Sequence, residues 1–363
     1  MSKLEVLVTA GDGIGPEVTR EAVRVLELVA KRAGVSVHLE HEPFGGASVD
    51  VHGVPATDAL LKRATEVDAV LLGAVGGPKY DSLPADKRPE KGLLNLRTAM
   101  AVYANLRPAK IFPVLADASP LRKDLAEGVD YVVVRELIGG LYFGKPRSLS
   151  GEPGKQVGIN TLTYTEDEIR RIGRKAFEIA RQRNKKVCSI DKANVLETMV
   201  LWRKTMEALA KEYPDVALSH MYVDNCAMQL VLNPAQFDVL VCENLFGDIL
   251  SDEAGATTGS IGLLPSASLG ETCALYEPIH GSAPDIAGQD KANPLAAILS
   301  VAMLFEHTLK NRELAETIER AVSAVLDDGL RTGDIYRGDT AGKKLVGTRA
   351  MGDAVLAKLA ELG

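Results

Sequence analysis

Two aspartates lie four residues apart in the segment FGDILSDEAG, at Asp248 and Asp252. The apolar pattern predicts a helix over about 245–255 after a strand at 237–244, so this spacing places both carboxylates on one helical face. Like charges so placed repel each other unless a cation lies beside them, and carboxylate oxygens suit Mg²⁺ or Mn²⁺. The pair indicates a divalent-metal site. A solvated acidic face is the alternative that spacing alone leaves open.

Asp224 and Lys192 each follow another predicted strand. Lys192 comes directly after VCSID (187–191), and Asp224 lies at the end of the strand in VALSHMYVDN. Open α/β sheets collect ligands at the carboxyl ends of their strands. A lysine beside a metal in a closed pocket can act as a base, because its pKa falls toward the working pH. The two residues extend the hypothesis to a metal-and-base cluster, with a surface lysine as the alternative for Lys192.

Three arginines and one tyrosine are candidates for substrate contact. Arg97 and Arg107 flank the helix-like TAMAVYAN, and Arg135 ends the apolar strand DYVVV. A guanidinium binds a carboxylate through two parallel hydrogen bonds, so three arginines suit a substrate with two carboxylates. Tyr142 follows two glycines in ELIGGLYFGKPR and could serve as a general acid. Surface ion pairs and a packed aromatic in a turn are the alternatives.

Two glycine-rich segments compete as the cofactor loop. GDGIGPE (11–17) has the spacing G-x-G-x-G instead of G-x-G-x-x-G, and it places Asp12 where a pyrophosphate would lie. The segment YEPIHGSAPDIAGQDKANP (276–294) is a long loop flanked by helices, as functional loops often are. An aspartate there, Asp285, could accept hydrogen bonds from ribose hydroxyls and would repel a 2′-phosphate, which favours NAD over NADP.

The elements that must position these residues alternate between strand and helix. Thr165 and Glu168 have capping-box spacing before a helical apolar face. Predicted strands cover 4–10, 67–75, 128–137, 187–191 and 237–244. Predicted helices cover 16–33 and 294 to about 310, the second with Asn293 as its cap and Pro294 in its first position. This alternation predicts an α/β fold with a mainly parallel central sheet. The segment 144–160 is the most loop-like insertion and is predicted to be a β-arm or flexible flap.

The composition excludes several classes of protein. The chain has 363 residues, 46% of them hydrophobic, which suggests two domains or one large one. A net charge of -7 without a basic stripe argues against nucleic-acid binding. The sequence has no apolar run of about eighteen residues and no signal-peptide pattern. Its four cysteines form no C-x-x-C pair. We therefore expect a cytoplasmic protein with reduced, buried cysteines and no membrane partner.

Several strings, taken in order along the chain, resemble the β-decarboxylating dehydrogenase family, which includes 3-isopropylmalate, isocitrate, homoisocitrate and tartrate dehydrogenases. They run from GDGIGPEV to HGSAPDIAG and include NLRTAMAVYANLRP, VRELIGGLYFGKPR, DKANVLE, YVDNCAMQL, FGDILSDEAG and GSIGLLPSASLG. The resemblance implies the two-domain fold of that family, which is not a Rossmann fold. It also implies a decarboxylating dehydrogenase that depends on NAD and on Mg²⁺ or Mn²⁺.

The resemblance further implies roles for individual residues. The substrate carboxylates would be bound by Arg97, Arg107 and Arg135, and the metal by Asp224, Asp248 and Asp252. Lys192 would remove the proton of the substrate hydroxyl, directly or through water and Asp224, and Tyr142 would protonate the carbon that loses CO₂. The cofactor would contact Ile14, Asn194, His280, Gly281, Ser282, Ala283, Asp285, Ile286 and Asn293, with Ile14 and Asn194 on the nicotinamide side.

The segment PEKGLLNLR, before the first arginine, indicates the substrate. Leu93, Leu94 and Leu96 are apolar and suit an isopropyl group, whereas a third carboxylate would need polar or cationic partners. Val195 would add to this pocket, and Glu90 would repel a third carboxylate. We therefore expect oxidative decarboxylation of 3-isopropylmalate to 4-methyl-2-oxopentanoate in leucine biosynthesis. Core packing is the alternative for the leucines, and Ile138 departs from the threonine expected in the family.

The family also implies a homodimer with a shared active site. Lys192, Asn194, Val195 and Asp224 would come from one subunit, and the arginines, Tyr142, Asp248 and Asp252 from the other. The cofactor-binding domain would be discontinuous, comprising 1–102 and 259–363. The domain for substrate, metal and dimerisation would comprise 103–258, with 144–160 as an arm between subunits.

Three alternatives stay open at this point. A sister enzyme would act on tartrate, malate or homoisocitrate. A regulatory subunit would bind without catalysis, although such a role does not require both Lys192 and Tyr142. An unrelated Rossmann dehydrogenase built on GDGIGPE would be active without a metal.

Overall fold

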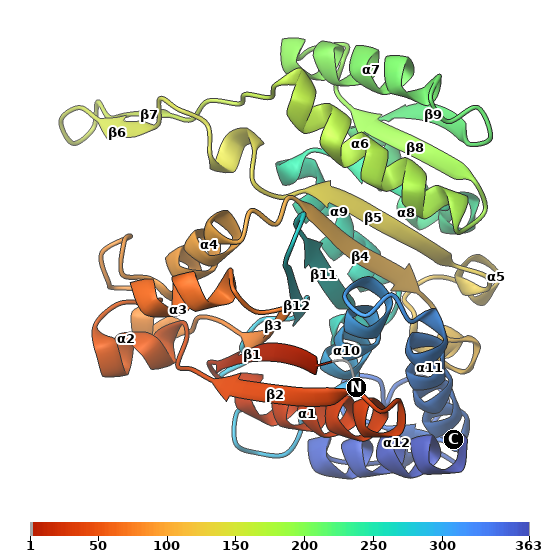
Figure 1. Ribbon diagram of the computed structural model, residues 1–363. Helices are drawn as coiled ribbons and strands as arrows, with labels where there is room; N and C mark the ends of the chain where they lie inside the picture. The colour runs from red at the N-terminus through yellow and green to blue at the C-terminus, as the bar shows by residue number, and fades with distance from the viewer. Residues whose placement is uncertain (1–2, 363) are drawn as a thin grey trace. The chain divides into compact units, whose positions relative to one another are not determined.

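The computed structural model describes residues 3–362, and the chain divides into two compact units (Figure 1). The first unit comprises the described residues of Met1–Val102, Phe112–Pro120 and Thr258–Gly363, and the second comprises Tyr103–Ile111 and Leu121–Thr257. Both ends of the chain thus belong to one unit and the middle belongs to the other.

The boundaries differ in one respect from those expected from the sequence. The segment 112–120 and Thr258 group with the first unit and not with the second. The physical reason is local packing, since the turn η2 (Pro113–Ala118) contacts α11 (Arg312–Asp327). The guanidinium of Arg331 also donates to the carbonyl of Val114 at 3.4 Å.

The strands of the first unit run in the order β2-β1-β3-β12-β11. They are β2 (Ser36–His41), β1 (Lys3–Gly11), β3 (Ala69–Ala74), β12 (Ala274–Pro278) and β11 (Pro265–Leu269). Every pair is parallel except β11 with β12. All six residues of β3 are buried, as expected of a parallel strand covered on both faces.

Four long helices of the first unit pack against one another. They are α1 (Gly15–Arg32), α10 (Leu295–His307), α11 (Arg312–Asp327) and α12 (Thr348–Leu362). Every residue of helix α10 from Leu295 to Phe305 is buried, because this part of the helix is apolar on every face. The smaller elements are α2 (Gly46–His52), α3 (Asp58–Ala64), η1 (Pro78–Tyr80), α4 (Pro89–Ala99), η5 (Ile261–Leu263), β13 (Leu330–Arg331) and β14 (Lys344–Leu345).

The strands of the second unit run in the order β4-β5-β10-β8-β9. They are β4 (Ala104–Lys110), β5 (Asp130–Glu136), β10 (Val239–Cys242), β8 (Lys186–Asp191) and β9 (Ala217–Tyr222). Only β4 is antiparallel to its neighbour in this order. The predicted α/β class with a mainly parallel sheet is therefore confirmed.

The helices of the second unit pack in two pairs, α6 with α7 and α8 with α9. Their bounds are α6 (Glu166–Arg181), α7 (Glu197–Ala210), α8 (Val223–Leu232) and α9 (Asn244–Thr257). Right-handed crossovers put the two pairs on opposite faces of the sheet, because the chain moves outward to β9 and then returns to β10. Three short elements complete the unit: α5 (Lys123–Ala126), η3 (Gly140–Tyr142) and η4 (Pro234–Gln236).

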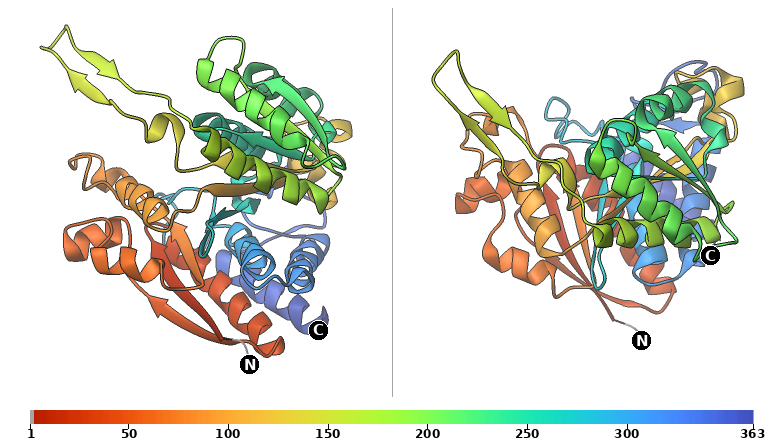
Figure 2. Two further views of the ribbon diagram at one scale, coloured as in Figure 1. Left: turned by 45° about the horizontal axis from the view of Figure 1, so that its top comes forward. Right: turned by 90° about the horizontal axis from the view of Figure 1, so that it is seen from above.

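The segment 144–160 forms an antiparallel hairpin of β6 (Ser148–Ser150) and β7 (Val157–Ile159). Figure 2 shows it reaching away from the sheet and helices of its own unit. Leu149, Val157 and Ile159 are exposed along it. The arm expected from the sequence is thus a hairpin whose apolar residues have no cover within the described chain.

The predicted helix cap and the burial of the cysteines agree with the structure, whereas the predicted ends of helix α10 differ. The capping box is present, with Thr165 accepting from the amide of Glu168 and the Glu168 carboxylate accepting from the amide of Thr165. Helix α10 begins at Leu295, one residue later than expected, with Pro294 at its N-cap, and it ends at His307 instead of about Lys310. The four cysteines are free and buried, as predicted.

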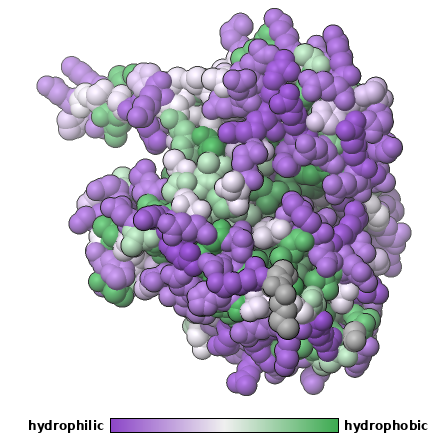
Figure 3. All heavy atoms as spheres, in the orientation of Figure 1, coloured by the Kyte–Doolittle hydropathy of each residue, from purple (hydrophilic) through white to green (hydrophobic). Residues whose placement is uncertain are grey.

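The surface of the chain is largely hydrophilic in the view of Figure 3. Within residues 3–362, the structure has no helix that is long and apolar enough to cross a membrane.

Replacing Thr165 by alanine should lower the free energy of unfolding by about 1 kcal/mol, because an orphan amide at the start of α6 loses its acceptor. Urea unfolding followed by circular dichroism measures this loss, with Thr165→Ser as the matched control that keeps the hydroxyl. Equal stability of the alanine and serine variants would contradict the role of the cap.

Candidate active site

The pairing of two parallel strands brings Lys192 and Asp224 together. Strands β8 and β9 are in register with Asp191 opposite Tyr222, so the residues just past their carboxyl ends are neighbours. The ammonium of Lys192 donates to Oδ1 of Asp224 at 2.6 Å. This hydrogen bond lowers the pKa of Asp224. The predicted partnership of these two residues is therefore present in the structure.

Helix α9 presents Asp248 and Asp252 one turn apart, beside two arginines from neighbouring strands. Arg135, at the end of β5, donates to Oδ1 of Asp248. Arg107, on β4, donates to Oδ1 of Asp252 at 3.3 Å, and its Nη1 lies 3.6 Å from Oδ1 of Asp248. The guanidinium groups offset the repulsion that the spacing of the two aspartates creates. Burial raises the pKa of Asp252, and Arg107 lowers it.

Tyr142 completes this group from the turn η3. Its hydroxyl donates to Oδ2 of Asp248 at 3.0 Å, and the guanidinium of Arg135 lies 5.9 Å from the centre of its ring. Burial and the adjacent Asp248 carboxylate raise the pKa of the Tyr142 hydroxyl. A phenol that holds its proton at neutral pH is suited to donate it, which agrees with a general-acid role.

Sequence reasoning missed the side chains that hold the two arginines. Asn244 accepts from Nε and Nη2 of Arg135 at 3.0 and 2.7 Å. Asn105 accepts from Nε of Arg107 at 2.7 Å, and Ser251 accepts from its Nη1 at 2.6 Å. Antiparallel pairing of β4 with β5 puts Asn105 opposite Arg135. Asn105 and Arg107 lie two residues apart on β4 and so share a face of the sheet, which is a local sign of their contact. The contacts of Asn244 and Ser251 join segments more than a hundred residues apart, which no local pattern indicates.

The carboxylates of α9 fit a divalent cation in their chemistry. Asp248 and Asp252 supply hard oxygen donors from one helical face, and the side chain of Asp252 is 68% exposed. Within residues 3–362, no group of three or more His, Cys, Asp or Glu side chains is placed to hold a metal. Asp224 instead lies beside Lys192 on α8. A site that joins Asp224 to the α9 pair across a subunit boundary therefore stays a prediction.

Arg97 lies in the first unit, where it forms a buried ion pair. Its Nη2 donates to Oε1 of Glu277 on β12 at 2.8 Å, while its Nε is buried without a hydrogen-bond partner. Sequence reasoning missed Glu277. The unsatisfied Nε is a donor that a substrate carboxylate could accept from.

The leucines expected to form a pocket differ in burial. Leu93 and Leu94 are half-buried on α4, whereas Leu96 is fully buried. The suggestion that Leu96 lines the pocket is therefore wrong, because this side chain belongs to the core. Glu90, on the same helix, is exposed.

The two glycine-rich segments lie side by side in the first unit. The amide of Ile14 donates to the carbonyl of Ser282 at 2.8 Å, and a Cβ on Gly13 would clash with that same carbonyl at 2.0 Å. The close approach needs glycine at position 13, where φ is +56°. This hydrogen bond joins Ile14, which is predicted to contact the nicotinamide, to the loop 276–294, which is predicted to bind the adenosine half.

His280 has an unsatisfied ring nitrogen in this loop. Its Nδ1 lies 2.9 Å from the carbonyl of Gly281, so Nδ1 carries the proton and Nε2 is an acceptor. Nε2 is buried without a partner, and burial lowers the pKa of the ring. A neutral imidazole with a vacant acceptor fits an N–H or O–H donor of a nucleotide.

The other predicted cofactor residues have mixed environments. Ser282 is buried, Ala283 and Ile286 are half-buried, and Gly281 and Asp285 are exposed. The amide of Asn293 is engaged at both ends, since Oδ1 accepts from the amide of Leu295 at 3.0 Å and Nδ2 donates to Asp334 at 2.9 Å. Asp334 is a supporting residue that sequence reasoning missed.

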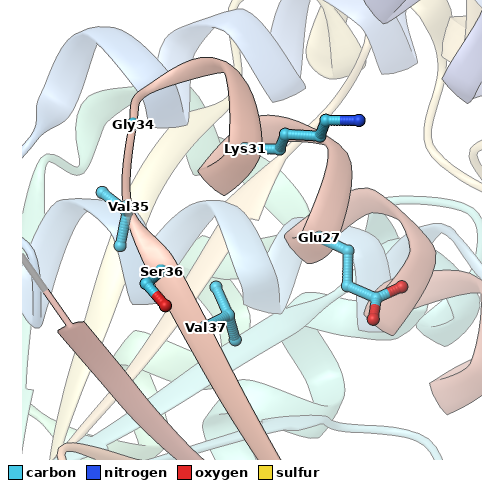
Figure 4. Close-up of a pocket in the computed structure, with 6 residues that line it drawn as sticks. All are labelled: Glu27, Lys31, Gly34, Val35, Ser36 and Val37. Atoms are coloured by element: carbon cyan, nitrogen blue, oxygen red, sulfur yellow. The ribbon is translucent and has the colours of Figure 1, made fainter. Parts of the chain in front are cut away.

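The remaining predicted residues are divided between the units. Asn194 and Val195 are exposed and belong to the second unit with Lys192 and Asp224, whereas Glu90, Leu93, Leu94 and Arg97 belong to the first. A site composed of both sets stays a prediction. Figure 4 shows an open hollow between the end of α1 and the start of β2, and none of the predicted site residues lines it.

The fold and these side chains define a dehydrogenase that acts on carboxylate substrates. The chain belongs to the isocitrate/isopropylmalate dehydrogenase family, whose model matches residues 5–355.

Several known proteins are similar to the chain over nearly its whole length. The 3-isopropylmalate dehydrogenase of Chromohalobacter salexigens is 59% identical over 97% of this chain and 98% of its own. That of Pseudomonas fluorescens is 57% identical over 100% of both. Among solved structures, isocitrate dehydrogenase from Methylococcus capsulatus has a TM-score of 0.84 and 36% identity, covering 99% of both chains. A β-decarboxylating dehydrogenase from Thermococcus kodakarensis has a TM-score of 0.77 and 35% identity, covering 99% of this chain and 96% of its own.

Replacing Asp248 by asparagine should weaken Mg²⁺ or Mn²⁺ binding and lower kcat, because the substitution removes the charge of a metal ligand. Loss of a residue that only supports a ligand costs roughly 10- to 100-fold, so the loss of the ligand itself should cost more. Titration of activity with each metal measures the change, and Glu253→Gln on the same helix is the matched control. An unchanged metal dependence in the Asp248 variant would remove this residue from the ligand set.

Proposed function

We propose that this protein catalyses the oxidative decarboxylation of 3-isopropylmalate to 4-methyl-2-oxopentanoate, using NAD and Mg²⁺ or Mn²⁺, in leucine biosynthesis in the cytoplasm. One observation carries the proposal. Arg107, Arg135 and Tyr142 surround the Asp248 and Asp252 carboxylates within a single unit. The relatives named 3-isopropylmalate dehydrogenase support the choice of substrate.

The arginines account for a substrate with two carboxylates. Arg107 and Arg135 sit in fixed orientations set by Asn105 and Asn244, so a carboxylate entering beside α9 meets guanidinium groups that need little reorientation. Arg97 contributes the unsatisfied Nε. Preorganised donors of this kind bind an anion at low entropic cost.

The donor set fits the absent groups. When bound, NAD would accept the hydride from the hydroxyl carbon, and the divalent cation, held by Asp224, Asp248 and Asp252, would stabilise the charge on the adjacent oxygen as CO₂ departs. His280 and the loop around Ser282 would hold the adenosine half, and Ile14 and Asn194 the nicotinamide half.

Lys192, Asp224 and Tyr142 would handle the protons. The ammonium of Lys192 donates to Asp224 at 2.6 Å. Lys192 would first give up a proton, to water or through Asp224, and as a neutral amine would then accept the proton of the substrate hydroxyl. Tyr142 would then give its proton to the carbon that has lost CO₂. The residue Tyr142 is half-buried, which limits competition from water.

The side chains proposed to contact the substrate favour a branched apolar group over a third carboxylate. Leu93 and Leu94 present half-buried methyl groups, and Val195 is 67% exposed. Glu90 would repel a third carboxylate of isocitrate or homoisocitrate. A sister diacid such as tartrate or malate would leave these apolar groups without contact.

Exposed apolar residues support a homodimer with a shared site. Met228, Val231 and Leu232 on α8 and Ile249 on α9 are 43–61% exposed, and these two helices pack together. The hairpin adds Leu149, Val157 and Ile159. Apolar patches of this kind favour burial against a second copy, which would bring Lys192 and Asp224 of one subunit to the α9 aspartates of the other.

A substrate panel run with and without a divalent metal tests the function. The purified chain should give the highest kcat/KM with 3-isopropylmalate and NAD, ahead of isocitrate, homoisocitrate, tartrate and malate, because only the isopropyl group has methyl groups to contact Leu93 and Leu94. EDTA should abolish turnover, and added Mg²⁺ should restore it. A clear preference for tartrate would overturn the substrate, activity with EDTA would overturn the metal, and no activity with any diacid would favour a regulatory subunit.

Replacing Asp285 by lysine should shift the cofactor preference toward NADP, because the substitution removes a hydroxyl acceptor and adds a cation beside the 2′-position. The ratio of kcat/KM for NAD and NADP measures the shift, with Asp290→Lys in the same loop as control. An unchanged ratio would remove Asp285 from the ribose site.

A further inference from the structure

Two buried glutamates meet at one tyrosine hydroxyl behind the candidate site. Glu136 ends β5, and Glu243 directly precedes α9; both side chains are almost fully buried. The hydroxyl of Tyr164 lies 3.4 Å from Oε2 of Glu136 and 3.3 Å from Oε2 of Glu243. The mechanism above does not use any of these three groups.

The number of available protons constrains this arrangement. The Tyr164 oxygen already accepts from the backbone amide of Asn244 at 3.0 Å, and the phenol has a single proton to donate. It can donate fully to one glutamate only. The other glutamate is satisfied at Tyr164 if it carries a proton and donates to the phenol oxygen, because two charged carboxylates on one hydroxyl repel each other.

The charges around the pair do not neutralise both glutamates. Nη2 of Arg171 on α6 lies 3.6 Å from Oε1 of Glu136, and this arginine is partly exposed. The other titratable or charged neighbours are Glu168 on α6, Arg135 on β5, Tyr142 in η3 and Cys242 on β10. Burial raises the pKa of Glu136 to about 7 and raises that of Glu243.

The pair is connected directly to the residues of the site. Glu136 accepts from the amide of Gly139 at 2.8 Å, in the turn that leads to Tyr142, and a Cβ on Gly140 would meet the Tyr164 hydroxyl at 2.4 Å. Glu243 accepts from the amide of Phe246 at 2.7 Å in the first turn of α9. The amide of Asn244, which binds Tyr164, belongs to the residue whose side chain holds Arg135.

We propose that Glu136 and Glu243 share one proton through the Tyr164 hydroxyl, and that this proton keeps Arg135 and Tyr142 in their working positions. These are positioning residues, and this part of the inference rests on the proposed roles of Arg135 and Tyr142. Loss of the proton to solvent as pH rises leaves two buried charges at one hydroxyl. The turn before Tyr142 and the start of α9 then separate, and Arg135 loses its orientation.

The pKa of glutamate in the unfolded chain determines whether the free energy of unfolding rises or falls with pH. An exposed glutamate has a pKa of about 4.3, so both glutamates are charged in the unfolded chain above about pH 5. The folded pair keeps one proton to a higher pH. The shared proton therefore stabilises the fold fully below the pKa of glutamate in the unfolded chain. This stabilisation is lost as pH rises toward the pKa of about 7 that Glu136 has in the folded chain.

The test measures the unfolding free energy of the full chain at several pH values between pH 5 and pH 7. The slope of this free energy against pH gives the number of protons released on unfolding. Relative to the double variant Glu136→Gln with Glu243→Gln, the wild type should release about one additional proton. Each single glutamine variant should lose more than half of that additional proton, because the remaining glutamate, although still buried, no longer faces a second charge at the Tyr164 hydroxyl. Tyr131→Phe, another buried tyrosine of the same unit, should behave as wild type.

Three results would overturn the shared proton. If each single variant removes only its own part of a two-proton release, the glutamates titrate independently. If all profiles are parallel, the pair is fully charged. Infrared spectroscopy of the wild type labelled with ¹³C-glutamate tests the point without a variant, since a shared proton requires a protonated-carboxyl band that shifts with the label, and absence of that band at pH 6 refutes the proposal.

The positioning role has its own readout. The alkaline limb of kcat/KM should move by at least about one pH unit in Glu243→Gln relative to the wild type, as expected when a coupled titration is removed. An unmoved limb with an altered proton count would confine the pair to a structural role. The proton count does not depend on catalysis, so failure of the proposed function would not be confused with failure of this inference.

Discussion

The carboxylate of Asp248 joins three elements of the second unit. It accepts from Arg135 at the end of β5 and from Tyr142 in η3, and it projects from α9 itself. Arg135 is almost completely buried, so its charge needs partners that stay in place when a ligand enters. Asn244 meets this need with two hydrogen bonds to the guanidinium. The arginine can therefore face a substrate without losing its support.

Buried charge is handled differently in the first unit. Arg97 and Glu277 are both mostly buried and pair at 2.8 Å. Removing one member of such a pair costs roughly 3–5 kcal/mol, because the other charge is left uncompensated. Glu277 thus fixes the guanidinium of Arg97 while leaving its Nε unsatisfied. In both units, a supporting side chain accepts from part of the guanidinium. Arg135 donates from another nitrogen to Asp248, whereas Nε of Arg97 has no acceptor.

Patterns that act over a few residues could be predicted from the sequence. The capping box at Thr165 and the neighbouring positions of Lys192 and Asp224 depend on local spacing or on the ends of adjacent parallel strands. Asn244 and Glu277 could not be predicted, because their contacts join segments more than a hundred residues apart. Asn105 lies two residues from Arg107 on the same strand, so its contact could have been found from the spacing. Leu96 was misassigned because an apolar residue of a pocket and one of the core have the same sequence pattern.

The glutamate pair shows why buried carboxylates are the hardest residues to interpret from sequence. VRELIGG and VCENLFGD each place a glutamate after an apolar strand, where a solvent-facing residue at the strand end would be expected. The structure buries both, and backbone amides of Gly139 and Phe246 satisfy one oxygen of each. The Tyr164 hydroxyl lies beside the second oxygen of Glu243 and beside the same oxygen of Glu136 that accepts from Gly139. Its ring packs edge-on against Trp202. Because that ring cannot move away without opening the core, the two carboxylates have to adjust their protonation instead of their positions.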